Sequence, residues 1–464
     1  MTHTDISQEA AIRLDELTKV SLLDAVKLCI DLKTSSKTNS SGLISNLRKI
    51  GYNYGLYYFA ESTTSSASDP IKKVDSQIRN GFTTGGAVFD INKVPNWEEY
   101  ENETRNIRYK AHSWLMIDSL LVADQIVEHN EYLQKAIDIS DDWIMNFIFK
   151  KSYDQFAWYD MAVGQRATKL AYILRRLIEI KAPEDQIFRF IIATDLHICE
   201  LTQEDRIAIH SNHGLFQMAG LLSLCHNVTW MFKSSKGIQF SERILKKMLK
   251  EHFAEDGLHL EHSPDYHLYM VNHLQSLKDS GWLSEGVGSV LKLLNFIIEA
   301  ADWMCTPNHH VIPIGDTANN VLMTKRWGDY QGSINLGHRL FPIGGLLINN
   351  SKQGDHLSQL VFSAQFHSRQ HKHADDLNVL YNLRGQPLLV DPGTYVYQYN
   401  HPHRMYCEST RGHNTVEIDG LNYSRFGQDG FGSAVTLVAK ADECIIAEGR
   451  VHHTRLISSA IPNN

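Results

Sequence analysis

The sequence lacks the features that mark several classes of protein. Its six cysteines are scattered and contain no CxxC pair, so we expect reduced core residues and no disulfide framework. No apolar run is long enough to cross a bilayer, so we expect no membrane partner. The formal net charge is −8 and no long basic run is present, which argues against a nucleic-acid partner.

The N-terminus also lacks the pattern of a signal peptide, a basic start followed by an apolar core. As written, the chain is therefore expected to be cytoplasmic, or periplasmic or secreted if a leader has been removed. At 464 residues it is too long for one simple core, which makes two domains the default expectation.

The pattern of apolar residues changes near residue 320. Before this point apolar residues recur at helical spacing, for example over residues 111–149, 166–182 and 212–228. From about 325, alternating and β-branched residues are separated by turn residues, as over 377–393 and 434–458. We predict a helical domain over 1–320, closing into a toroid or an open solenoid, and an antiparallel β-sandwich over 325–464. The strands are few, so either the sandwich is small or the sequence is a truncated form.

The stretch from His371 to His413 is the densest in groups that could bind an ion. His373, Asp391 and His413 lie on separate segments, and such groups are costly to bury unless they pair or coordinate something. If the first segment is a strand, His371 and His373 share a face, because side chains two apart point the same way. One would then face a substrate and the other an ion.

The helical half has two polar segments of its own. His210 to Gly214 opens an apolar helix, and an exposed helix start with Asn212 and His213 is a natural receptor for a carboxylate. Residues 256–267 form a loop that carries Glu261 and Tyr266. The plain alternatives are that Asn212, or its neighbour Ser211, is only a helix cap and that Tyr266 is an interior tyrosine.

Together, these segments resemble the heparinase II/III-like polysaccharide lyases, a group that includes heparin, heparan sulfate and alginate lyases. The resemblance covers most of the chain from about residue 100 and is most specific at HKHAD, VDPGTY and HNTV. The matching pieces, in the order of the family, are WYDMAVGQR (158–166), SNHGLFQMAG (211–220), DGLHLEHSPDYH (256–267), PIGDT (313–317), HKHAD (371–375), LLVDPGTYVY (388–397) and STRGHNTVEIDG (409–420).

The resemblance implies an incomplete (α/α) toroid followed by an antiparallel β-sandwich, and β-elimination at a uronic acid in an anionic polysaccharide or oligosaccharide. Asn212 and His213 would neutralise the C5 carboxylate, and Tyr266 and His371 would transfer protons. These four groups should meet in one cleft between the domains. Arg166, Trp158 and Glu261 are the expected substrate contacts.

The family's metal site maps onto His373, Asp391 and His413. We expect one divalent ion there, zinc by its ligand set, with a mainly structural role. The oligomeric state stays open, with a homodimer as one option.

Several readings remain open beside the lyase. Arg166 could instead be a buried arginine that pairs with Asp160 or Glu261. A glycoside hydrolase on the same scaffold would need two carboxyl groups flanking the bond, for which Asp160, Glu261, Asp265 and Asp316 are candidates. A third reading is a non-catalytic protein of glycan binding or polysaccharide assembly.

Overall fold

The computed structural model divides the chain into two compact units, and each is described by itself. The first unit comprises residues 1–248 and 276–285, and the second comprises 249–275 and 286–464. The structure describes residues 5–31, 39–49, 69–84, 86–127, 130–283, 288–368, 370–396, 398, 400–423, 434–441, 444–450 and 456–458.

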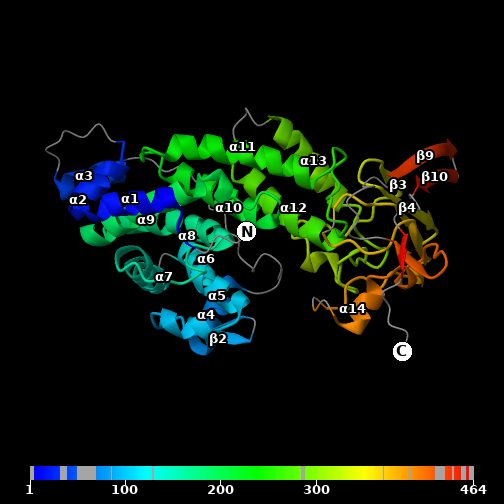
Figure 1. Cartoon of the computed structure of the whole chain (residues 1–464), viewed down its shortest axis with the longest axis horizontal. Helices are drawn as coiled ribbons and strands as arrows, with labels where there is room; N and C mark the ends of the chain where they lie inside the picture. The colour runs from blue at the N-terminus through cyan, green and yellow to red at the C-terminus, as the bar shows by residue number, and fades with distance from the viewer. Residues whose placement is uncertain are drawn as a thin grey trace. The chain divides into compact units, whose positions relative to one another are not determined.

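The first unit is built mainly from helices (Figure 1). Its apolar positions recur at helical spacing, and many helices begin at a Ser, Thr or Asp cap. The helices that lie wholly or mostly in it are α1 (Gln8–Thr18), α2 (Leu22–Cys29), α3 (Ser40–Lys49), α4 (Pro70–Asn80), α5 (Arg105–His112), α6 (Asp118–Ile126), α7 (Asn130–Ile144), α8 (Asp160–Glu179), α9 (Glu184–Leu201), α10 (Asn212–Asn227) and α11 (Ser234–His252). One short hairpin interrupts them, β1 (Phe82–Thr84) paired antiparallel with β2 (Ala87–Phe89).

Two glycines let α8 and α10 cross in direct backbone contact. A Cβ at Gly220 would lie 2.1 Å from the carbonyl oxygen of Gly164, and a Cβ at Gly164 would lie 2.6 Å from that of Phe216. Any larger residue at either position would push the helices apart. The crossing therefore fixes the first residues of α10 against the first residues of α8.

The second unit combines helices with antiparallel sheets (Figure 1). The helix α12 (Pro264–Asp279) lies mostly in this unit. The other elements are α13 (Gly288–Ala301), β3 (Gly337–Phe341), β4 (Leu346–Gln353), β5 (His356–Ser363), β6 (Asn378–Leu383), β7 (Gln386–Leu389), α14 (Pro402–Cys407), β8 (Leu421–Tyr423), β9 (Ala434–Ala441), β10 (Cys444–Arg450) and β11 (Leu456–Ser458). Of these, β3 to β7 form one five-stranded sheet in sequence order.

A second strand layer covers one face of this sheet. The β9–β10 hairpin places Val435 in an apolar cluster with Leu347 and Ala364. Gly449 of β10 comes so close that a Cβ would lie 2.8 Å from the Phe362 ring. Two antiparallel layers joined by an apolar core are the arrangement of a sandwich.

Two segments that carry candidate site residues are irregular and do not form strands. His371 and His373 do not lie on a strand but in the loop after β5, where His371 has a left-handed φ of 53°. Residues 413–420 are likewise irregular and lead into β8. In both places hydrogen bonds to distant side chains replace the ladder that the alternating sequence predicts.

The boundary expected near residue 320 lies inside the second unit, where helices give way to strands. Among the described helices, none combines the length and apolarity needed to cross a bilayer. Cys29, Cys199, Cys225 and Cys305 are buried free thiols, as expected of reduced core residues. Five free cysteines are described, the fifth being the half-buried Cys407.

Two buried histidines of the second unit are held in the neutral form. Both ring nitrogens of His267 are bonded, Nε2 to the Ile297 carbonyl oxygen at 3.0 Å and Nδ1 to the backbone N–H of His259 at 3.3 Å. Burial lowers the pKa of His267 to about 4. Burial, with the nearby Lys372 ammonium, lowers the pKa of His262 to about 3.

These shifts predict a loss of stability in mild acid. Above the unfolded pKa of 6.5 neither state is protonated, and below it only the unfolded state binds protons, so stability falls as the pH drops toward 4. Each histidine contributes a slope of about 1.4 kcal/mol per pH unit. Denaturant unfolding between pH 7 and 4.5 measures this. His267→Gln, which removes one titration, should lose less over that range, and a flat wild-type profile would contradict the assignment.

Candidate functional site

The first unit presents Asn212 and His213 at the start of α10. Ser211 caps the helix, and its Oγ accepts from the His213 backbone N–H at 3.3 Å. Asn212 is therefore not the cap, and its partly exposed amide makes no side-chain hydrogen bond within the described residues. The amide and the helix N-terminus are both available to a carboxylate.

His213 is oriented by the first residues of α8. Its Nδ1 lies 3.2 Å from Asp160 Oδ1 and 3.5 Å from the Tyr159 hydroxyl. Asp160 can accept a hydrogen from Nδ1, which directs the other ring nitrogen away from α8. This contact depends on the close crossing of α8 and α10 at Gly164 and Gly220.

A cavity of about 520 Å³ adjoins this helix start. It is lined by Asp160 and by residues 205–211, which include Arg206 and His210. The cavity is thus bordered by two carboxylates, those of Asp160 and Asp205, a guanidinium and an imidazole beside the N-terminus of α10. Polar groups of this kind in a concave region are typical of a binding site.

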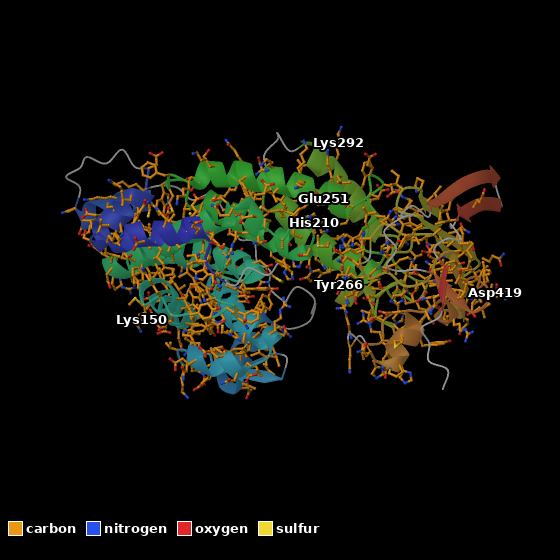
Figure 2. All side chains as sticks on the ribbon, viewed as in Figure 1. Lys150, His210, Glu251, Tyr266, Lys292 and Asp419 are labelled. Carbon is orange, nitrogen blue, oxygen red and sulfur yellow. The ribbon has the colours of Figure 1, made fainter. Side chains whose placement is uncertain are left out.

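In the second unit, Tyr266 and His371 lie together although about a hundred residues separate them. Tyr266 is in the first turn of α12 (Figure 2). Its ring stacks on the His371 imidazole with 3.7 Å between centroids and 23° between planes. Both side chains are partly exposed, so a phenol and an imidazole are presented side by side.

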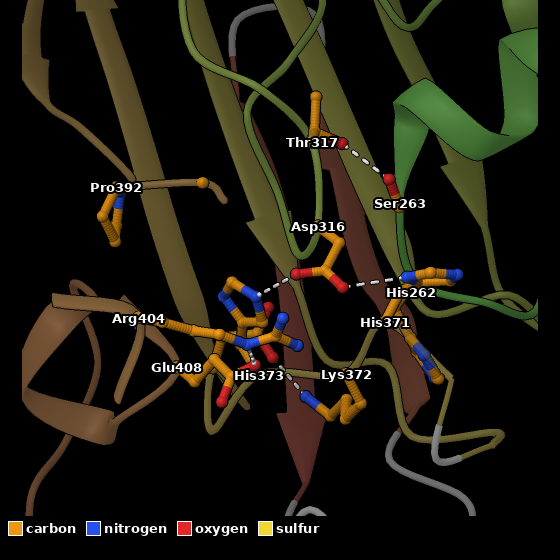
Figure 3. A network of polar contacts seen from close by, with 12 residues as sticks. His262, Ser263, Asp316, Thr317, His371, Lys372, His373, Pro392, Arg404 and Glu408 are labelled. Carbon is orange, nitrogen blue, oxygen red and sulfur yellow. Dashed lines mark hydrogen bonds and ion pairs between the residues drawn. The ribbon is translucent and has the colours of Figure 1, made fainter. Parts of the chain in front are cut away.

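Asp316 joins His371 to His373 (Figure 3). Its Oδ2 lies 2.9 Å from His371 Nδ1, and its Oδ1 lies 3.1 Å from His373 Nε2. Burial alone would raise the pKa of Asp316, but the hydrogen bonds from the two imidazoles hold it well below its usual range. The anionic carboxylate fixes a hydrogen on His371 Nδ1 and leaves Nε2 for proton transfer.

The sequence before Asp316 explains its position. Gly315 has a φ of 56°, and a Cβ there would lie 2.6 Å from the His262 carbonyl oxygen and 2.8 Å from that of His371. Only glycine combines this backbone conformation with this approach. The PIGDT segment therefore inserts between two loops and brings the carboxylate to both imidazoles.

Glu261 faces the other side of His371. Its Oε2 lies 3.4 Å from His371 Nε2, and its Oε1 lies 4.0 Å from His252 Nδ1. Burial raises the pKa of the Glu261 carboxyl, although the two imidazoles oppose this. Glu261, expected as a substrate contact, is thus in contact with the imidazole expected to transfer a proton.

His373, Asp391 and His413 converge in the interior of the second unit. Their potential ligand atoms all lie within 4.8 Å of one another. Asp391 Oδ2 lies 2.9 Å from His413 Nδ1. The buried atoms His373 Nδ1 and His413 Nε2 have no hydrogen-bond partner among the described residues. Two unpaired imidazole nitrogens beside a carboxylate are a donor set that suits zinc.

Arg166 and Trp158 belong to the interior of the first unit. Arg166 is fully buried, donates to His197 Nε2 at 3.2 Å and lies 4.0 Å from the centre of the Trp143 ring. Trp158 packs on the same His197. Both expected substrate contacts are therefore interior residues, with Trp158 only 7% exposed, and no hydrogen bond joins Arg166 to Asp160 or Glu261.

The sequence does not indicate that Asp316 links the two histidines, and its PIGDT motif suggests this residue only as a possible hydrolase carboxylate. It does not indicate the pairing of Asp160 with His213 either. Both contacts join segments more than 50 residues apart, and spacing gives no direct sign of them.

The chain is similar to known proteins along most of its length. Its residues 19–319 match the model described as heparinase II/III N-terminus, and residues 335–454 match heparinase II/III-like, C-terminal. The chain belongs to the heparinase II/III-like family. This membership places it among the polysaccharide lyases, and the fold class expected from the sequence is confirmed. A search of curated proteins found no match.

Solved structures with the same fold support this. A mutant of the heparan sulfate lyase HepC from Pedobacter heparinus aligns with a TM-score of 0.65 and 17% identity, over 87% of this chain and 71% of that one. A heparinase III gene product gives 0.67 and 15% over 93% and 75%. A further heparinase III gives 0.60 and 14% over 97% and 75%. At these identities the likeness concerns the fold.

The variant Asp316→Asn tests whether this carboxylate orients the two histidines. Asp316→Asn keeps the size of the side chain but removes its charge, so His371 and His373 lose the anion that orients them. Polysaccharide cleavage should fall by roughly 10–100-fold, the usual effect of removing a carboxylate that supports a functional histidine.

The matched control is Asp355→Asn, the same change at an exposed turn residue. It should leave the rate unchanged. An Asp316→Asn protein with the wild-type rate would show that Asp316 does not position His371.

Proposed function

We propose that the chain cleaves a uronic-acid-containing polysaccharide or oligosaccharide by β-elimination. A base removes the C5 proton of the uronate, the C4–O4 bond breaks, a C4–C5 double bond forms, and an acid protonates the departing O4. The C5 proton is weakly acidic while the neighbouring carboxylate is charged. The enzyme must therefore stabilise that carboxylate as it takes on enolate character.

The stacked pair of Tyr266 and His371 is the observation that carries this proposal. Elimination needs two proton-transfer groups at one sugar ring, and the phenol and imidazole lie 3.7 Å apart between ring centroids. Asp316 orients the imidazole through Nδ1, so Nε2 is the atom available for transfer. In this proposal Tyr266 and His371 share the roles of base and acid.

Asn212 and His213 supply the carboxylate-neutralising half of the proposal. The amide of Asn212, the imidazole of His213 and the N-terminus of α10 are donors of the kind that stabilise an enolate-like charge. These residues belong to the first compact unit, and Tyr266 and His371 belong to the second. Their convergence on one uronate remains a prediction.

The contacts of the carboxylates favour a lyase over a hydrolase. Hydrolysis needs two carboxyl groups free to act on one glycosidic bond. Asp160 is paired with His213, Glu261 lies 3.4 Å from His371, Asp265 is paired with Arg326 at 2.6 Å, and Asp316 is paired with two histidines. Each of these carboxylates serves a cationic or imidazole partner.

We also propose a divalent ion, zinc by its donor set, at His373, Asp391 and His413. The two imidazole nitrogens without partners and the buried carboxylate fit such an ion. Bound there, the ion would cross-link the loop of His373 to the segments of Asp391 and His413. Its role would be structural, because it would hold the loop that carries His371.

Tyr266→Phe tests the catalytic proposal directly. The change keeps the ring and its stacking on His371 but removes the ionisable hydroxyl, so turnover should fall by roughly 10²–10⁴-fold while binding is retained. The measurement is the ultraviolet absorbance of unsaturated uronate, on the best substrate from a panel of uronate polysaccharides. Near-normal production of unsaturated product by the variant would remove Tyr266 from the mechanism. If the wild-type protein released only saturated products with new reducing ends, the reaction would be hydrolysis and not elimination.

The same assay tests whether the two units act on one ring. Asn212→Ala should lose roughly 10²–10³-fold in rate, as for other donors to a developing oxyanion. Residues that act as a unit are strongly non-additive. The double variant with Tyr266→Phe should therefore be little slower than the slower single variant. If the loss in rate of the double variant equalled the product of the two single losses, the two residues would act independently.

Metal analysis tests the ion at His373, Asp391 and His413. His413→Ala removes one imidazole, so the purified variant should contain one equivalent less of zinc than wild type and should unfold at a lower temperature. Equal metal content in the two proteins would disprove this site.

A further inference from the structure

A second group of potential ligands lies in the turn between α11 and α12. It consists of His252, His259 and Glu261, whose potential ligand atoms all lie within 4.8 Å of one another. His252 ends α11, and the other two follow in the loop before α12. None of the three is shared with the site at His373, Asp391 and His413.

The backbone holds this turn in a fixed shape. The Leu260 N–H donates to the His252 carbonyl oxygen at 2.8 Å, and Phe253 pairs with His259 in an antiparallel bridge. At the tip, Gly257 has a φ of 93° and lies so close to Phe296 that a Cβ would be 2.4 Å from its carbonyl oxygen. The two imidazoles are therefore brought together by the hairpin itself.

His259 is the member that packing alone does not explain. Its side chain is buried, with 3% of the residue exposed, and neither Nδ1 nor Nε2 has a hydrogen-bond partner among the described residues. A neutral imidazole has one donor and one acceptor, and leaving both unpaired in the interior is unfavourable. Such a group calls for an ion, a ligand or a buried water.

Two neighbouring histidines show what a structural histidine looks like in this segment. Both nitrogens of His267 are bonded to backbone groups. Both nitrogens of His262 are bonded as well, to the Gln370 carbonyl oxygen and the His367 N–H. His259 differs from them in having neither contact, while a second imidazole and a carboxylate lie beside it.

We propose that His252, His259 and Glu261 form a second metal site, which takes a divalent transition-metal ion of the zinc class. Two imidazoles and a carboxylate with a fourth position open are a common zinc ligand set. With ligand bonds of about 2.0–2.2 Å, the donor atoms would lie about 3.3 Å apart, so they close by up to about 1.5 Å on binding. Glu261, the only partly exposed member of the three, has the most freedom for this movement.

A bound ion would stabilise the ionised form of the Glu261 carboxyl. Burial raises its pKa, and a cation at Oε1 keeps it ionised. Its Oε2 remains 3.4 Å from His371 Nε2. The ion would thus fix the carboxylate that contacts this imidazole. This consequence for catalysis rests on the proposed function, whereas metal binding itself does not.

Zinc titration of the chelator-stripped protein, without substrate, tests the site. His259→Gln should bind one equivalent less of zinc than wild type. His356→Gln, the same change at an exposed position of β5, should bind as much as wild type. In His413→Ala, the ion at His259 should remain, and adding His259→Gln to it should remove one further equivalent.

Glu261→Gln is the second variant, in case His259→Gln does not fold. It keeps the shape of the side chain and removes a charged ligand, so the affinity of this site should fall by roughly 10-fold or more. Anomalous scattering at the zinc edge from crystals of the zinc-loaded wild type should show a peak between His252, His259 and Glu261. Unchanged zinc stoichiometry in folded His259→Gln, or only a water at this position, would overturn the proposal. Lyase activity does not enter these measurements, so failure of the proposed function leaves them intact.

Discussion

The arrangement of the second unit depends on one buried carboxylate, that of Asp316. It accepts from two imidazoles, one on each oxygen, and those hydrogen bonds keep its pKa low in spite of burial. A buried anion is tolerated only where donors compensate for the lost hydration. The same contacts set which nitrogen of each histidine carries a hydrogen. A single side chain therefore links the stacked tyrosine–histidine pair to the candidate metal ligands.

Glycines at close approaches make these polar contacts possible. Gly315 allows the Asp316 loop to pass between two carbonyl groups, and Gly164 and Gly220 bring α8 against α10. At each place, an added Cβ would lie within 3 Å of backbone atoms, which a packed interior cannot absorb without moving an element. The positions of the candidate site residues in each unit are therefore set by the packing of the backbone and not by the side chains that do the chemistry.

Five buried histidines of the second unit fall into two kinds. His262 and His267 have both nitrogens bonded and are neutral structural residues. His259, His373 and His413 each retain at least one buried nitrogen without a partner among the described residues. Burial is common to both kinds, so it does not distinguish them. The unpaired nitrogen distinguishes the two kinds, because leaving it buried without a partner costs free energy that a bound ligand would offset.

The sequence by itself indicated a helical part followed by strands, the family, and that the members of the sets His373/Asp391/His413 and Tyr266/His371 lie together. Apolar periodicity and short motifs are local properties, and these determine the type of an element and the residues it presents. The sequence did not show that His371 lies in a loop with positive φ, that Arg166 is buried among tryptophans, or that Asp316 joins two histidines. These features are contacts between segments tens of residues apart. Only the tertiary structure decided them, because they follow from which loops and helices can pack at backbone contact, and periodicity within one segment carries no information about that.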